Sequence, residues 1–167
     1  MLQSLALAAA TMSNPYQEVL EGVPFLRQAP SERHEAICSH LHALVAKSMA
    51  GMKAANLLSR RMGIMVTCTD KVCPDLSLIT AVTGKLWLAA EIIDAGDNQP
   101  DTVIKKQIYE QIRLPRLWII DPRYNNVEIY HGTEFGLALK GILAGKELLT
   151  EKLLPEFQVT IAELFAK

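Results

Sequence analysis

The sequence lacks the features that identify several common classes of protein. Its only cysteines are Cys38, Cys68 and Cys73, and no two of them form a Cys-x-x-Cys pair. A disulfide framework is therefore not expected, and we predict reduced thiols in a cytoplasmic protein. Neither a glycine-rich phosphate loop nor a Gly-x-Ser-x-Gly elbow occurs, so the signatures of P-loop nucleotide hydrolases and of serine hydrolases are missing.

The chain also lacks an excess of positive charge and a long hydrophobic run. The net charge is −1 and the pI is near 6.4, which argues against a nonspecific nucleic-acid coat protein. The apolar run at 5–10 has no Lys or Arg before it and is too short to span a bilayer, so we expect no membrane association. We interpret residues 1–12 as an N-terminal extension, or as upstream of a true start at Met12, and residues 13–167 as one domain.

Apolar and charged residues, at 50% and 21% of the chain, have the ordinary proportions of a globular domain. The pattern predicts a helix over 31–50 with Ser31 as its N-cap, a helix over 100–113 that begins at Pro100, and a closing helix over 160–166. Strands are predicted at 63–69, 76–80, 86–93, 117–120 and 127–130, with two short strands within 135–149. Residues 52–61 are left open between a helix and a loop, and a turn is predicted at 70–71.

Glu91 is the most informative single residue, because it interrupts the apolar run of a predicted buried strand. An ionised carboxylate in such a place is costly unless a positive group meets it. One interpretation is a structural ion pair, and the other is a metal ligand with Asp75 as the second carboxylate at the start of the neighbouring strand. Mg²⁺ is commonly held by one or two carboxylates together with waters and substrate phosphate, so these two acids would suffice.

The helix at 100–113 supplies a candidate cation. At about 100° per residue, Asp101, Lys105 and Tyr109 share one side of this helix with its isoleucines. Lys105 is therefore expected to face the sheet, while Lys106 turns toward solvent. The alternative is that Lys105 only forms a helix-surface pair with Asp101, four residues earlier.

These residues carry a resemblance to a known family. Tyr16 to Gly22, with Glu18 within it, approximates the family's first motif, and Pro74-Asp75 matches its Pro-Asp motif. Glu91, the spacing of Lys105 and Tyr109 after it, and the Leu-Trp-Ile-Ile-Asp-Pro strand at 117–122 complete the match. The chain thus resembles the Uma-two family of restriction endonucleases, a branch of the PD-(D/E)xK nuclease superfamily. It departs from the superfamily at Ile93, where a lysine is usual, which makes Lys105 the expected replacement.

The resemblance implies an α/β, restriction-endonuclease-like fold, a mixed sheet flanked by helices, that hydrolyses DNA with Mg²⁺ or Mn²⁺. Asp75 and Glu91 would hold the metal, Lys105 would orient a water or stabilise developing charge, and Glu18 would position Lys105 or a second metal. DNA is the implied partner, and a homodimer is a separate hypothesis for the assembly. The alternative function is a nuclease-fold module that binds DNA or a protein without cleaving it.

Overall fold

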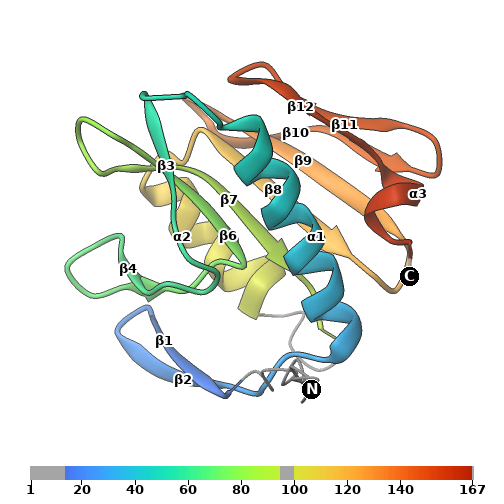
Figure 1. Ribbon diagram of the computed structural model, residues 1–167. Helices are drawn as coiled ribbons and strands as arrows, with labels where there is room; N and C mark the ends of the chain where they lie inside the picture. Colours follow the sequence, from blue (N-terminus) through green and yellow to red (C-terminus); the bar gives the residue numbers. More distant parts are fainter. Residues whose placement is uncertain (1–13, 95–99, 167) are drawn as a thin grey trace, which may run out of the picture.

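A six-stranded mixed sheet organises the chain (Figure 1) in the order β10-β9-β8-β7-β6-β3. The computed structural model describes residues 14–94 and 100–166. The six strands are β3 (Ala55–Leu57), β6 (Leu76–Thr80), β7 (Leu86–Ile92), β8 (Arg116–Asp121), β9 (Asn126–Thr133) and β10 (Gly136–Ala144). The predicted extension at 1–12 lies outside the described residues, so it and the domain boundary at residue 13 stay predictions.

One face of the sheet packs against α1 (Glu32–Ser48). Ser31 begins this helix as predicted, since its side chain accepts a hydrogen bond from the backbone of His34, and Glu32 and Glu35 suit the positive end of the helix dipole. Ile37 and Leu41 belong to the helix face that is buried against the sheet. The same core is completed by β11 (Leu148–Glu151), β12 (Leu154–Thr160) and α3 (Ile161–Leu164).

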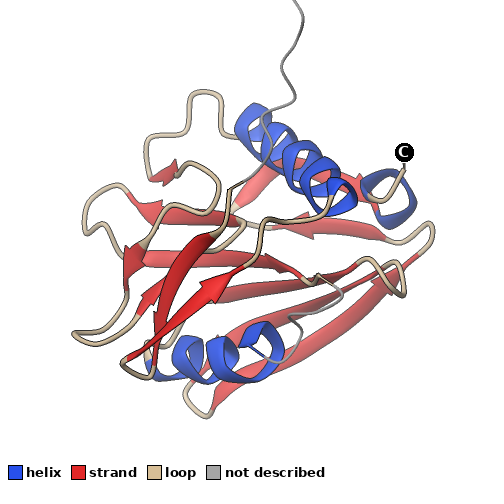
Figure 2. Cartoon of the chain, turned by 90° about the horizontal axis from the view of Figure 1, so that it is seen from below, coloured by secondary structure: helices blue, strands red, loops and turns tan. Residues whose placement is uncertain are grey.

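The opposite face of the sheet is covered by α2 (Lys105–Gln111), so that α1 and α2 lie on opposite sides of it (Figure 2). A turn of π-helix, η1 (Pro100–Ile104), precedes α2. A small second sheet in the order β2-β1-β5-β4 packs into the same core through β1 and β5. Its strands are β1 (Tyr16–Leu20), β2 (Val23–Arg27), β4 (Ile64–Met65) and β5 (Lys71–Val72).

The position of α2 follows from the direction of the strands that it connects. Strands β7 and β8 are parallel, whereas the other pairs in the described residues are antiparallel. Parallel neighbours need a crossover connection, which here contains α2. The crossover places Lys105, the first residue of α2, against the sheet face that carries Glu91.

Several predicted elements differ from the structure. The strand predicted at 63–69 is only Ile64–Met65, because Thr67 side-chain hydrogen bonds with Asp70 hold the following residues in a turn. The turn predicted at 70–71 was wrong at Lys71, which begins β5, and the undecided region 52–61 contains strand β3. The two strands predicted within 135–149 are β10, irregular near Gly141, and β11.

Candidate functional site

The centre of the candidate site is a buried ammonium group between two carboxylates. Nζ of Lys105 lies 2.6 Å from Oε2 of Glu91 and 2.9 Å from Oε1 of Glu18. Lys105 and Glu18 are 0% exposed and Glu91 is 2% exposed. Residues from α2, β7 and β1 therefore meet in one place, with Lys105 facing the sheet as its position on the helix predicts. The partly exposed Lys106 instead lies over the ring of Tyr130.

Each carboxylate beside Lys105 has a second neighbour. The hydroxyl of Tyr109, one helical turn after Lys105, donates a hydrogen bond to Oε1 of Glu91. Burial, and then the negative charge of Glu91, raise the pKa of Tyr109, so the phenol keeps the proton that it donates. Oε1 of Glu18 also accepts a 2.6 Å hydrogen bond from the backbone of Cys73, and its Oε2 lies 3.7 Å from Nε of Arg27.

Asp75 directly precedes β6 and reaches the end of β7. Its Oδ2 accepts a 2.8 Å hydrogen bond from the backbone N–H of Ile92, the residue after Glu91. Its Oδ1 lies 2.7 Å from Nε2 of His34 and accepts a 3.0 Å hydrogen bond from Arg61. Asp75 and Glu91 thus stand at the same end of the sheet, but each has its own group of partners.

His34 links this end of the sheet to the start of α1. Its Nδ1 lies 3.0 Å from Oδ2 of Asp94, and its Nε2 faces Asp75. Burial lowers the pKa of His34, but the hydrogen bond to Asp75 and the charges of both aspartates outweigh it and raise the pKa overall. For Asp75, burial works to raise the pKa, but the His34 contact, the Ile92 hydrogen bond and the Arg61 charge lower it overall.

The two opposite pKa shifts predict how stability depends on pH. The lowered pKa of Asp75 contributes stability above its unfolded value of about 3.9, and this is lost as pH falls through the folded pKa. The raised pKa of His34 contributes stability below about 6.5, and this is lost as pH rises through the folded pKa. We expect a His34→Gln variant to lose less unfolding free energy than the wild type as pH rises above about 6.5, measured by urea denaturation at a series of pH values.

His131 provides the control for this measurement. Its pKa is lowered, first by burial and then by the charge of Arg116, so it should destabilise the fold as pH falls through the unfolded value. A His131→Gln variant is therefore expected to change the pH dependence in the opposite sense to His34→Gln. Equal pH profiles for wild type and His34→Gln would contradict the assignment of a raised pKa to His34.

The predicted site residues thus fall into two adjoining groups. Glu18, Glu91 and Lys105 converge directly, while Asp75 is held by His34 and Arg61. The side chain of Asp101, predicted on the same helix face, lies outside what the structure describes. Sequence reasoning gave no role to His34, Tyr109 or Arg61. Tyr109 could have been found from its spacing after Glu91 in the family match, and His34 from its place in the first turn of the predicted helix at 31–50, whereas Arg61 stands in a loop with no sequence signal.

The donor chemistry of these acids fits an oxygen-preferring divalent cation. Asp75 and Glu91 supply two carboxylates at one end of the sheet, and Oε2 of Glu18 is a buried oxygen that accepts no hydrogen bond within the described residues. In the part of the chain that the structure describes, no group of three or more His, Cys, Asp or Glu side chains is arranged to hold a metal. Mg²⁺ is the kind of ion that one or two carboxylates can hold when waters complete its coordination.

Comparisons with known proteins agree with this architecture. A family model, Uma2, described as "Putative restriction endonuclease", matches residues 4–162. A similar fold occurs in the crystal structure of "a putative nuclease belonging to DUF820" from Anabaena variabilis, with a TM-score of 0.76 and 16% identity over 92% of this chain and 91% of that chain. The comparison with curated proteins gives no match. The predicted fold, a mixed sheet flanked by helices, is confirmed.

None of the helices within the described ranges combines the length and the hydropathy needed to cross a bilayer.

Proposed function

We propose that this chain is a metal-dependent endonuclease that hydrolyses phosphodiester bonds in DNA. The chain belongs to the Uma2 family, described as "Putative restriction endonuclease". The observation that carries the proposal is the buried Lys105 ammonium between Glu18 and Glu91, at the end of the sheet where Asp75 also stands. Buried ionisable groups that converge in this way are characteristic of functional sites.

The residues of the site have distinct roles in this proposal. Asp75 and Glu91 would hold Mg²⁺ or Mn²⁺. When bound, the metal lowers the pKa of a coordinated water and neutralises charge on the phosphate. Lys105 keeps a positive charge beside Glu91, where it stabilises negative charge that develops on a phosphoryl oxygen. Glu18 positions Lys105 through the 2.9 Å contact, and Tyr109 fixes the orientation of Glu91 through its hydrogen bond.

A second candidate function is supported by the completeness of these contacts. Both oxygens of Glu91 and both oxygens of Asp75 have a protein partner, and Glu18, Glu91 and Lys105 are almost fully buried. A nuclease-fold module that binds DNA or a protein without cleaving it would keep such a network for structure alone.

DNA is the proposed partner and a homodimer the proposed assembly. The three free cysteines support a reducing, cytoplasmic location.

Nicking of supercoiled plasmid separates the two functions. We expect the wild type to convert the plasmid to open circles with Mg²⁺ or Mn²⁺ and to stop when the metal is chelated. Asp75→Asn and Glu91→Gln keep the size of each side chain but remove its negative charge. Each is expected to lower the nicking rate by about a hundredfold or more, the scale of losing one electrostatic contact in an active site.

Glu156→Gln is the matched control, because Glu156 is an exposed glutamate on β12. It should nick at the wild-type rate, and thermal unfolding should confirm that all the variants are folded. If the wild type nicks no faster than Asp75→Asn and Glu91→Gln, the enzyme proposal is wrong and the non-cleaving module takes its place.

A further inference from the structure

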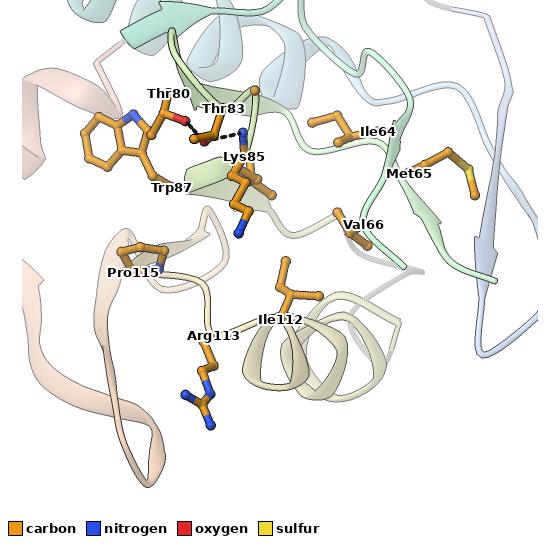
Figure 3. A pocket seen from close by; sticks show the side chains of 12 residues that line it. Ile64, Met65, Val66, Thr80, Thr83, Lys85, Trp87, Ile112, Arg113 and Pro115 are labelled. Carbon is orange, nitrogen blue, oxygen red and sulfur yellow. Dashed lines mark hydrogen bonds between the residues drawn. The ribbon is translucent and has the colours of Figure 1, made fainter. Parts of the chain in front are cut away.

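A cavity of about 700 Å³ lies on the α2 side of the sheet (Figure 3). It lies at the start of β7, whereas Glu91 lies near the end of that strand. We call it the β7 groove. Its walls come from the β6–β7 turn, from the β4 region and from the residues that end α2. They include Lys85, Trp87, Val66, Ile112 and Arg113.

The β7 groove differs in charge from the protein as a whole. The chain carries 17 Lys and Arg against 18 Asp and Glu. Lys85 and Arg113 line the groove and are exposed, and within the described residues no Asp or Glu lines it. Lys85 extends into the hollow and Arg113 stands at its rim (Figure 3). The lining therefore places two positive charges beside apolar side chains and the hydroxyl groups of Thr80 and Thr83.

The groove and the candidate active site share one face of the sheet. Leu86, beside the groove, and Ala89 belong to the core under α2, and Glu91 contacts Lys105 and Tyr109 of α2. A strand rises about 3.3 Å per residue, so Lys85 lies about 20 Å from Glu91 along β7. Because the buried core under α2 lies between them, the groove is a surface separate from the candidate active site.

Two backbone turns hold the two cations at the groove. Gly84, directly before Lys85, has φ +67°, a conformation that the tight β6–β7 turn needs and that glycine adopts without strain. Arg113 itself has φ +53° at the end of α2, where a left-handed residue is a common helix ending. Lys85 and Arg113 form no ion pair with another residue that lines the groove, because none of the described lining residues is Asp or Glu.

We propose that the β7 groove binds the sugar-phosphate backbone of duplex DNA, with Lys85 and Arg113 each contacting a phosphate. This inference rests on the proposed nuclease function and extends it to a second substrate contact. Positive charge without a competing carboxylate complements phosphate, and the apolar wall suits the sugar edge. The groove accounts for DNA binding by a chain whose net charge is slightly negative.

The test measures binding separately from cleavage. Fluorescence anisotropy follows the binding of a short fluorescein-labelled duplex of mixed sequence to the full chain in EDTA, at several salt concentrations. Each phosphate contact contributes about 0.9 to the slope of log K against log salt. The Lys85→Ala/Arg113→Ala variant should therefore show a slope smaller in magnitude by about two than the wild type.

Lys47→Ala/Lys146→Ala is the matched control, since Lys47 in the last turn of α1 and Lys146 after β10 are exposed and distant from the groove in sequence. It removes the same charge but should keep the wild-type slope. Equal slopes for both double variants would contradict DNA binding by the β7 groove. Plasmid nicking, and with it the proposed function, would be unaffected by that result. A wild-type protein that neither binds the duplex nor nicks plasmid would contradict both the groove proposal and the proposed nuclease function.

Discussion

Replacement of Lys105 by methionine is expected to lower the unfolding free energy by roughly 3 to 5 kcal/mol. Methionine fills a similar volume but carries no charge, so Glu18 and Glu91 would remain buried, close together and without their ammonium partner. Breaking a buried ion pair in this way costs far more than an exposed one, because the remaining charge cannot regain its hydration. Urea denaturation measures the loss.

Lys106→Met provides the matched control on the same helix. Lys106 is partly exposed, and its ammonium lies 4.3 Å from the ring centroid of Tyr130. Losing this contact should cost about 0.5 to 1 kcal/mol. Adding Glu91→Gln to Lys105→Met should cost less than the sum of the two single changes, since the second change removes a charge that the first has left unpaired. Additive costs would mean that Lys105 and Glu91 do not stabilise each other.

Gly132→Ala is the second change with a large expected effect. A Cβ at Gly132 on β9 would lie 2.5 Å from the carbonyl oxygen of Leu114 and 3.2 Å from Cα of Pro115. Both neighbours are backbone atoms, and the Gly132 N–H donates a 2.9 Å hydrogen bond to Pro115 at the same place. The methyl group therefore has to push β9 away from the segment that follows α2, at a cost of roughly 3 kcal/mol.

Gly141→Ala on the adjacent strand β10 is the control, because nothing lies within 4 Å of its added Cβ. It should change the unfolding free energy by no more than about 0.5 kcal/mol. Equal melting temperatures for the two alanine variants would show that β9 can move without cost. The N–H of Leu114 also donates a hydrogen bond to the carbonyl oxygen of Tyr109 at the end of α2. Gly132→Ala is therefore expected to weaken the Lys105 contacts too.

The parts of this protein that could be predicted from the sequence are those fixed by local patterns. Ser31 and Thr160 have short-range capping partners, and both begin helices as predicted. Glu91 stands out because one charge in a long apolar run has few explanations, and helical periodicity alone directs Lys105 to the same core. These signals depend on neighbours within a few residues.

The parts that could not be predicted depend on distant contacts. Arg61 reaches Asp75 from a loop 14 residues earlier, and His34 reaches it over 41 residues. Strand β5, where a turn was predicted, forms because it pairs with β4 and with β1, although its own two residues carry little β signal. Propensity is a weak guide where pairing partners decide the structure.

The parallel pairing of β7 with β8 has a kinetic consequence. It joins two antiparallel halves of the sheet, β3-β6-β7 and β8-β9-β10, each of which can form from nearby segments. The halves can join only after the crossover is closed, and contacts over long loops form late and slowly. Lys105 is carried into the core by this same step. The charged centre is therefore assembled when the two halves meet, and a chain trapped before that point would hold its strands but no site.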